Sequence, residues 1–159
     1  MIINALAVEH LPAVRELMTL GAPYVRARDL SDYWLYASLF SSTCPLALDG
    51  DGRVLGAVIA LRSQDQPEDV YVQDVMVRPD ARGAGIATAL LAVVADRATG
   101  WGCRRLYLTS EPGNTAAHAA WLSMGFTNLP GDQRVNGVEV ITAFKGPGKD
   151  RAVYQRSLA

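Results

Sequence analysis

The stretch that decides the fold of this chain is Val77-Arg78-Pro79-Asp80-Ala81-Arg82-Gly83-Ala84-Gly85-Ile86-Ala87. An apolar run that predicts a buried strand leads into it, and an Ala- and Leu-rich run that predicts a helix leads out of it. The first turn of a helix has N–H groups without partners at the positive end of the helix dipole, so anions bind there. Gly83 and Gly85 would let phosphate oxygens approach the backbone, Arg82 would add charge, and Thr88 would add a hydroxyl. The sequence therefore predicts an anion cradle, although a plain strand–turn–helix connection stays open.

The strand before this cradle, residues 70–77, changes its hydrophobic phase once. Its first two valines share one parity, whereas its last two share the other. An extra residue in one strand produces such a change, so we expect a β-bulge near Gln73 and Asp74. A bulge leaves backbone groups unpaired and re-aims a side chain, and both effects favour a site on this strand.

The rest of the chain predicts short elements with no linker between them, and therefore a single domain over residues 1–159. The first half of the chain predicts a strand at 2–8, a helix with Leu11, Val14, Leu17 and Met18 on one face, a second helix capped by Ser31 with Trp34, Ala37 and Phe40 on one face, and a hairpin of 46–48 and 54–61. The second half predicts a helix at 85–99, a strand at 105–109 and a helix from an Asn114 cap to Met124. A hairpin of 133–135 and 138–144 and a strand at 152–158 are expected to follow.

Composition argues against several classes of function. Half of the 159 residues are apolar and 19% are charged, which is typical of a globular domain. The net charge of −1 comes without a basic stripe, so no nucleic-acid partner is expected. The longest strongly apolar run, residues 86–95, is about half a membrane span, so no membrane partner is expected either. Cys44 and Cys103 are expected as free thiols in a reducing cytoplasm, with no signal peptide and no metal-ligand pattern.

Two motifs, in this order, resemble the GNAT superfamily of acyl-CoA-dependent N-acetyltransferases. The first is Arg82-Gly83-Ala84-Gly85-Ile86-Ala87, which fits the Gln/Arg-x-x-Gly-x-Gly/Ala motif of that family, with Val77-x-Pro79 before it and Leu90-Leu91 after it. The second is Asn114, Ala117 and Gly125-Phe126, on a helix that follows the next strand. The resemblance implies an α+β (mixed α/β) domain of three layers. Helices would flank a splayed mixed sheet, with acetyl-CoA wedged between two central strands.

The resemblance also implies which residues bind acetyl-CoA. Backbone groups of Val75, Met76 and Val77 would bind the pantetheine arm, and an N–H of Met76 or Val77 would stabilise the oxyanion. Asn114 would contact the pantetheine side. The pyrophosphate would be held by Arg82, Gly83, Ala84, Gly85, Ile86 and Ala87, with Thr88 beside them.

Trp121 is a departure from the pattern of the family. Many members have a tyrosine four residues before the Gly-Phe pair, and that tyrosine protonates the departing thiolate. An indole N–H donates a hydrogen bond but is no practical acid. Trp121 would then be a wall against the pantetheine or a core residue. Slower catalysis, a substitute donor or water all stay open for the proton.

The candidates for the general base are carboxylates at strand ends. Asp74 is favoured because it lies at the expected bulge, whereas Asp69 and Glu111 also suit a strand start and a loop. His118 shares a helix face with Trp121 and would relay a proton, or it would be a packing histidine. Three aromatic residues of the second helix would line the acceptor pocket or the core. They are Tyr33, Trp34 and Tyr36.

The function expected from the resemblance is transfer of an acetyl group from acetyl-CoA to a primary amine by direct attack. The acceptor would be a small-molecule or peptide amine. The first alternative is a catalytically weak acyl-CoA-binding or sensor module, because Trp121 replaces the usual acid. The second is a Rossmann-type NAD(P) oxidoreductase, although Thr88 occupies the third glycine position of that fingerprint. A homodimer through the C-terminal strands is a further hypothesis.

Overall fold

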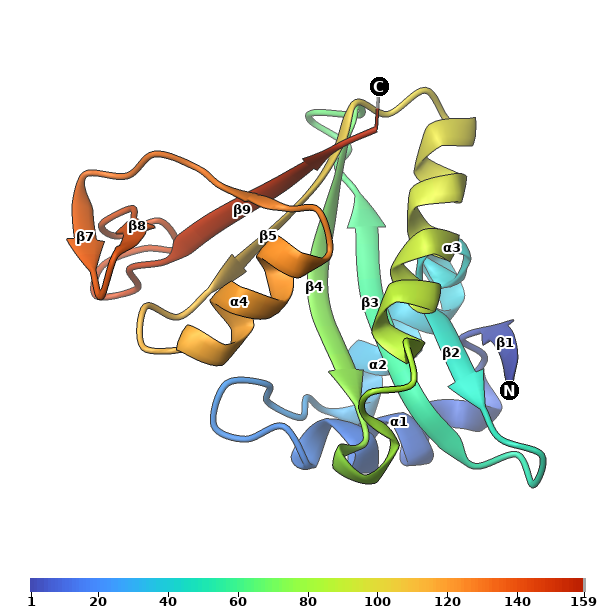
Figure 1. The fold of residues 1–159 in the computed structure, drawn as a ribbon. Coiled ribbons are helices and arrows are strands. Elements are labelled where there is room, and N and C mark those ends of the chain that lie inside the picture. The colour runs from blue at the N-terminus through green and yellow to red at the C-terminus, as the bar shows by residue number, and fades with distance from the viewer. Residues whose placement is uncertain (159) are drawn as a thin grey trace.

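A mixed β-sheet forms the centre of the molecule (Figure 1). The computed structural model describes residues 1–158, and within them the sheet has seven strands in the order β1-β2-β3-β4-β5-β9-β6. Neighbouring strands run antiparallel, except for the parallel pair β4 and β5. The strands are β1 (Ile2–Ala5), β2 (Pro45–Leu48), β3 (Val54–Arg62), β4 (Asp69–Val77), β5 (Arg105–Ser110), β6 (Thr127–Asn128) and β9 (Ala152–Ser157), with a separate hairpin of β7 (Gln133–Val135) and β8 (Val138–Val140).

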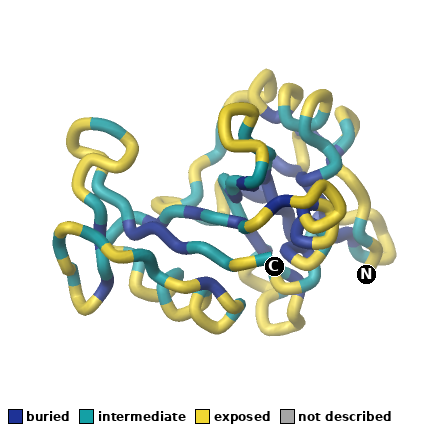
Figure 2. The backbone as a smooth tube through the Cα atoms, turned by 90° about the horizontal axis from the view of Figure 1, so that it is seen from above, coloured by how far each residue is buried: buried dark blue, intermediate teal, exposed yellow. Residues whose placement is uncertain are grey.

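Helices cover both faces of the sheet and give three layers. The helices are α1 (Leu11–Thr19), α2 (Leu30–Leu39), α3 (Ile86–Gly100) and α4 (Thr115–Ser123), with short 3-10 turns η1 (Val8–His10), η2 (Ser41–Thr43) and η3 (Pro79–Ala81). One core cluster joins the sheet to α1 and α2, and the other joins it to α3. Figure 2 shows the buried stretches concentrated along the central strands. The expected α+β fold of three layers is confirmed.

The apolar faces follow the spacing of the sequence. The four residues expected on one face of the first helix are all buried in α1. Helix α3 is apolar on most sides, and Leu90, Leu91 and Val94 are fully buried between it and the sheet. Burying one such side chain contributes roughly 1.5–3 kcal/mol, so α3 is a rigid support for the loop at its N-terminus.

The expected bulge is present in β4. Ile59 of β3 pairs with Asp74, and the next residue, Ala60, pairs with Val72, so Gln73 is the extra residue. Side chains of directly paired residues point to the same face of a sheet. Asp74 therefore lies on the face of Ile59, toward α1 and α2, and without the bulge it would point into the core below α3.

Two expectations about element boundaries were wrong. The second helix has Asp29 as its N-cap rather than Ser31, and its buried residue is Tyr33, whereas Trp34 is 52% exposed. The strand expected at 138–144 ends at Val140. Beyond it the chain turns at Ala143, whose φ of 55° is incompatible with a strand, although Asn136 and Gly137 form the expected hairpin turn with positive φ.

Strands β4 and β5 separate after a short common stretch. Their parallel register covers Asp69 to Tyr71 on β4 and Arg105 to Tyr107 on β5. Strand β5 then continues with β9 as its partner, while β4 continues with β3 (Figure 1). The edge of β4 that faces β5 therefore has no partner strand over its last residues, and the two strands diverge, which leaves an opening in the hydrogen-bonded sheet.

Two smaller findings concern classes of function. Cys44 and Cys103 are buried and unlinked, and burial raises the pKa of the Cys44 thiol to about 12. Among residues 1–158, no helix is long and apolar enough to cross a bilayer, and no cluster of three or more His, Cys, Asp or Glu side chains is placed to hold a metal ion.

Candidate active site

The predicted anion cradle lies where β4 ends and α3 begins. Gly83 and Gly85 have φ values of 86° and 77°, which favour glycine, and Gly85 is the N-cap of α3. That N-cap provides no side-chain hydrogen bond, and the first turn of α3 contains no acidic residue. A Cβ added at either glycine would meet no atom within 4 Å, so open space surrounds the backbone at both positions. These features fit a phosphate group bound by backbone N–H groups.

The charges around the cradle favour an anion. Asp80 is the one carboxylate between Val77 and Ala87, and it lies 3.0 Å from Arg53 and 3.4 Å from Arg78. The hydrogen bond from Arg53 lowers the pKa of Asp80, so its charge is matched by these cations. Arg82 is exposed and donates from Nε to the carbonyl of Val77 at 3.3 Å. Its guanidinium is therefore held at the cradle with its other N–H groups available to a ligand.

The predicted pantetheine site follows the free edge of β4. Val75, Met76 and Val77 occupy the part of β4 that has β3 on one side and no partner strand on the side of β5. The strand leads from there directly into the cradle. The structure thus brings these three residues and the loop Arg82 to Ala87 together along one path, as an extended ligand with a pyrophosphate would need.

Helix α4 forms the other wall of the opening. Asn114 is its N-cap, as expected, and its Oδ1 accepts a hydrogen bond from the N–H of Ala117 at 3.2 Å. The amide NH2 of Asn114 and the second lone pair of its Oδ1 are therefore left for a ligand. Trp121 donates from Nε1 to the Ser110 hydroxyl at 2.8 Å and packs edge-on against Phe126. Trp121 is thus a half-buried residue packed against the core, with its N–H already used.

His118 has a partner that the sequence did not reveal. Its Nδ1 lies 2.6 Å from the hydroxyl of Tyr154 on β9. Burial raises the pKa of Tyr154 to about 12, so the hydroxyl keeps its proton and is suited to donate to Nδ1. In that tautomer Nε2 carries the remaining proton of a neutral His118. No local signal links residues 36 positions apart, and only the pairing of β5 with β9 brings them together.

Asp74 lies in a second cluster, on the opposite face of the opened strands. Its side chain is 10% exposed, and its Oδ2 is buried without a hydrogen-bond partner among the described residues. Burial raises the pKa of Asp74, and the charges of Arg28 and Lys145 oppose that rise. Arg28 Nε lies 3.9 Å from Oδ2 of Asp74, which is too long for a hydrogen bond. A buried carboxylate with a raised pKa and an unused oxygen is suited to accept a proton.

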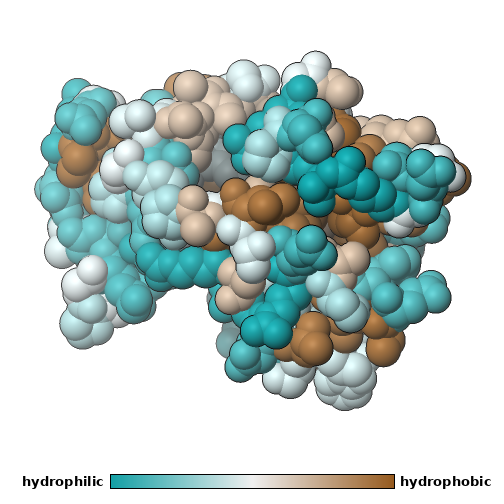
Figure 3. Space-filling view, turned by 90° about the horizontal axis from the view of Figure 1, so that it is seen from below, coloured by the Kyte–Doolittle hydropathy of each residue, from teal (hydrophilic) through white to brown (hydrophobic). Residues whose placement is uncertain are grey.

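The aromatic residues of α2 divide between this cluster and solvent. Tyr33 accepts a hydrogen bond from the Arg28 N–H at 3.0 Å, and burial, together with the charge of Asp74, raises the pKa of Tyr33 and of Tyr36. Both tyrosines therefore lie near Asp74; Tyr33 is fully buried in the core, and Tyr36 is half-buried beside it. Trp34 does not lie there, because it faces outward. The space-filling view from below shows a hollow between the side of the molecule that carries α4 and the side that carries α1 to α3 (Figure 3).

The other candidate bases are engaged in ion pairs. Asp69 binds Arg104 Nε at 2.7 Å and Arg105 at 3.1 Å, and the hydrogen bond from Arg104 lowers the pKa of Asp69. Glu111 lies 3.2 Å from Arg26, so this pair ties the segment between α1 and α2 to the segment between β5 and α4. Neither carboxylate has the unused buried oxygen of Asp74.

Asp69→Asn is expected to destabilise the fold and to leave catalysis by the folded enzyme unchanged. Losing its charged hydrogen bonds to Arg104 and Arg105 should cost about 1–3 kcal/mol of unfolding free energy. The cost stays modest because Arg104 is largely solvated. The native pKa of Asp69 is lowered, so its contribution is present above about pH 4 and is lost as the pH falls through the native value. Urea unfolding of both proteins at pH 7 and pH 3 would check this, and equal stability at pH 7 would contradict it.

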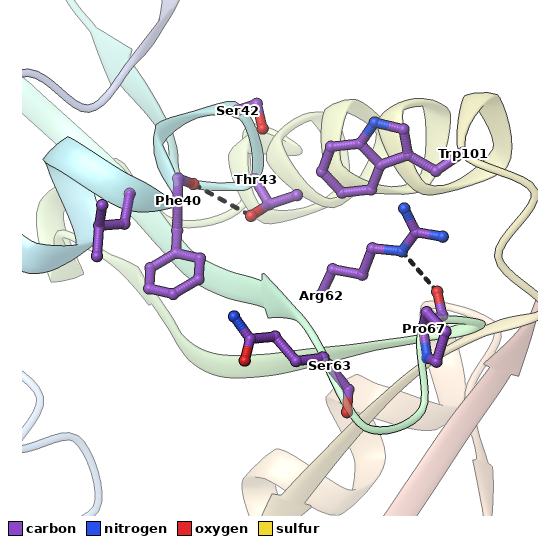
Figure 4. A pocket seen from close by; sticks show the side chains of 9 residues that line it. Phe40, Ser42, Thr43, Arg62, Ser63, Pro67 and Trp101 are labelled. Atoms are coloured by element: carbon purple, nitrogen blue, oxygen red, sulfur yellow. Dashed lines mark hydrogen bonds between the residues drawn. The ribbon is translucent and has the colours of Figure 1, made fainter.

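A separate surface pocket lies at the other end of α3. Figure 4 shows Arg62 lying beside Trp101, with Phe40 and Thr43 on the facing side. The Arg62 guanidinium is 5.4 Å from the Trp101 ring centre and donates from Nε to the Pro67 carbonyl at 2.6 Å. The fifteen residues of α3, about 22 Å of helix, separate this pocket from the cradle. It is therefore not part of the opening between β4 and β5.

The chain matches the acetyltransferase (GNAT) family over residues 11–126. It belongs to the GNAT family. The matched residues include the cradle, the opened strand β4 and all of α4, so the resemblance seen in the two sequence motifs is confirmed.

Several relatives in this family share one name. An L-2,4-diaminobutyric acid acetyltransferase from Nocardia farcinica is 35% identical over 92 residues, which cover 58% of this chain and 47% of that protein. A protein of the same name from Streptomyces coelicolor is 33% identical over 126 residues, which cover 77% of this chain and 73% of that protein. The chain thus spans about half the length of the Nocardia relative.

The fold is also that of solved GNAT structures. A diaminobutyrate acetyltransferase from Paenibacillus lautus, in complex with L-2,4-diaminobutyric acid and coenzyme A, has a TM-score of 0.79 to this structure. The two are 23% identical, and the alignment covers 98% of this chain and 93% of the other. This likeness supports the splayed sheet and its three layers.

Proposed function

We propose that this protein transfers the acetyl group of acetyl-CoA to a primary amine. The observation that carries the proposal is the opening between β4 and β5, which ends at an uncapped helix with two positive-φ glycines. A thioester held along the free edge of β4 would lie between the two polar clusters. Asp74 lies on one face of the strands and His118 on the other, so an amine and a thiol would meet different residues.

The steps assigned to residues follow from this arrangement. Asp74 accepts a proton from the ammonium group of the acceptor, and the free amine attacks the thioester carbonyl. The new C–N bond forms as the C–S bond breaks, and an N–H of Met76 or Val77 stabilises the oxyanion. The amide nitrogen then loses its second proton to water. The sulfur leaves as a thiolate, which accepts a hydrogen bond from the Nε2–H of His118 and takes its proton from water. The balance is one amide and one thiol, with one proton released.

The acceptor that is best supported by the relatives is L-2,4-diaminobutyrate, because it is the substrate in their names. A panel of amines with acetyl-CoA, read out as release of the CoA thiol, would test the proposed function. Turnover with at least one acceptor and none without is the expected result. Stabilisation by acetyl-CoA without turnover of any amine would instead favour an acyl-CoA sensor. Stabilisation by NAD alone would favour an oxidoreductase.

His118→Ala is expected to lower kcat by about tenfold or more and to leave the KM for acetyl-CoA nearly unchanged, because a thiolate leaves tolerably well without a proton. Tyr154→Phe removes the hydroxyl that orients Nδ1 and should reproduce part of the loss. The difference from wild type should be smaller with a thioester of a more acidic thiol. An unchanged kcat in both variants would show that the pair only packs α4 against β9.

Two further expectations about this protein belong with the proposal. The two unlinked, buried thiols support a location in the reducing cytoplasm. A homodimer through the C-terminal strands stays a prediction, and gel filtration that gives a monomer at every concentration would remove it.

A further inference from the structure

The cluster around Asp74 contains more positive than negative charge. Arg28 and Lys145 both act on Asp74, which is the carboxylate they face. Burial raises the pKa of Tyr33, Tyr36 and Tyr107 and keeps these phenols neutral, and the more distant carboxylates Asp32 and Asp69 act on Tyr36 and Tyr107 rather than on Asp74. An acceptor that brought only ammonium groups would therefore be repelled by a site with a surplus cation.

Lys145 comes to this cluster from a distant segment. It lies between β8 and β9, and its Nζ donates to the Tyr71 hydroxyl at 2.7 Å while lying 5.3 Å from the centre of the same ring. Tyr71 pairs with Leu61, two residues along β3 from the partner of Asp74, so both side chains lie on one face of β4. The ring of Tyr107 on β5 packs against Tyr71 at 5.1 Å. This contact places a lysine across the splitting point of the two strands.

Arg28 approaches the same face from the segment before α2. It precedes the N-cap of α2, and its Nε is buried without a hydrogen bond, as is Oδ2 of Asp74. The Arg28 side chain is 37% exposed, so its guanidinium is accessible, but a buried polar atom without a hydrogen bond costs free energy unless water or a ligand satisfies it. An oxyanion at Arg28 and an ammonium at Asp74 would satisfy both atoms at once. One molecule with both groups a few bonds apart has the chemistry of an amino acid.

We propose that the acceptor is an amine that carries a carboxylate, and that Arg28 and Lys145 bind the carboxylate while Asp74 takes the proton of the reacting amine. The guanidinium offers a planar fork to a carboxylate, and the ammonium adds a point charge from a different segment of the chain. The proposal rests on the proposed function and names the substrate class of its site. It excludes plain polyamines as good acceptors.

The test compares two acceptors that differ in one group. L-2,4-diaminobutyrate and 1,3-diaminopropane have the same spacing between their amines, and only the first has the carboxylate. In wild type, kcat/KM should be at least about 100-fold higher for diaminobutyrate. In Lys145→Met and in Arg28→Met this ratio should fall about 10- to 100-fold, the usual range for losing a charged hydrogen bond. Any effect of the substitution on Asp74 should change kcat/KM for both acceptors equally. The ratio of the two kcat/KM values therefore isolates recognition of the carboxylate.

Matched controls and a binding readout keep the result clear. Lys149→Met in the same segment and Arg15→Met on the exposed side of α1 should leave the ratio unchanged. Calorimetric titration of each acceptor into the CoA-bound protein tests recognition without turnover. Selective binding of diaminobutyrate without product would support this inference and overturn the proposed function. Equal kcat/KM for the two acceptors, equal binding of both, binding of neither, or a ratio unchanged in both variants would overturn the inference.

Discussion

Asp74→Asn is expected to lower kcat/KM for the amine by about 10²- to 10⁴-fold, the usual contribution of a general base. Its buried, unpartnered Oδ2 is the feature that distinguishes it from Asp69 on the same strand. The amide keeps the size of the side chain but cannot accept a proton. The affinity for acetyl-CoA should be unchanged, because the cradle and the free edge of β4 remain intact.

The pH profile should separate this role from a structural one. Burial raises the pKa of Asp74, so its charged form, the active one, is lost at a higher pH than for an ordinary carboxyl near 3.9. Arg28, Lys145, Tyr33 and Tyr36 are the ionisable groups that face it, and the first two oppose the rise. In wild type, kcat should fall on the acid side with this apparent pKa. The variant should show no such fall of kcat at acid pH and should keep its low activity across the pH range.

Stability gives the control for the same variant. A carboxyl with a raised native pKa costs stability where it is charged, so Asp74→Asn should leave the thermal midpoint at pH 7 unchanged or higher. Asp69→Asn, the matched change on β4, should show the opposite pattern of lost stability and retained kcat. Full activity of Asp74→Asn, or the same loss of kcat in both variants, would remove Asp74 as the base.

Local signals explain why much of the site was predictable. The cradle depends on two glycines whose positive φ is written into the sequence, and the start of α4 depends on the Asn114 cap, whose bond spans three residues. The bulge showed itself as a change of parity within one strand, and that parity directly tells which side chains share a face. Each of these features is decided within a few residues, so a single sequence contains the information.

The unpredicted contacts join segments that are distant in the sequence. Lys145 reaches Tyr71 across 74 positions, and His118 reaches Tyr154 only because β9 returns beside β5. Sheet order, not local pattern, decides both. The face of α2 was mispredicted for another reason. Residues 33–36 are all apolar or aromatic, so the sequence does not distinguish the buried Tyr33 from the exposed Trp34.

Gly85→Val is expected to abolish most of the stabilisation by acetyl-CoA and by CoA. In wild type, ligand at about 100 times its Kd should contribute roughly 2.7 kcal/mol, or about 5–10 °C in the thermal midpoint of a domain of this size. A branched side chain at a φ of 77° strains the backbone, and its Cβ enters the space where the pyrophosphate is proposed to bind. A loss of about 100-fold in affinity would leave a shift below about 2 °C at the same ligand concentration.

Gly102→Val separates strain from loss of the cradle. Gly102 follows the other end of α3, has a φ of 76°, and would likewise place a Cβ where no atom lies within 4 Å. The strain in the two variants is therefore similar, and both should unfold at a lower temperature without ligand. Because Gly102 is a helix length from the cradle, Gly102→Val should keep the full shift with acetyl-CoA, and NAD should shift neither protein. An undiminished shift in Gly85→Val would place the cofactor elsewhere, whereas equal losses in both variants would mean that the strain acts through α3 as a whole.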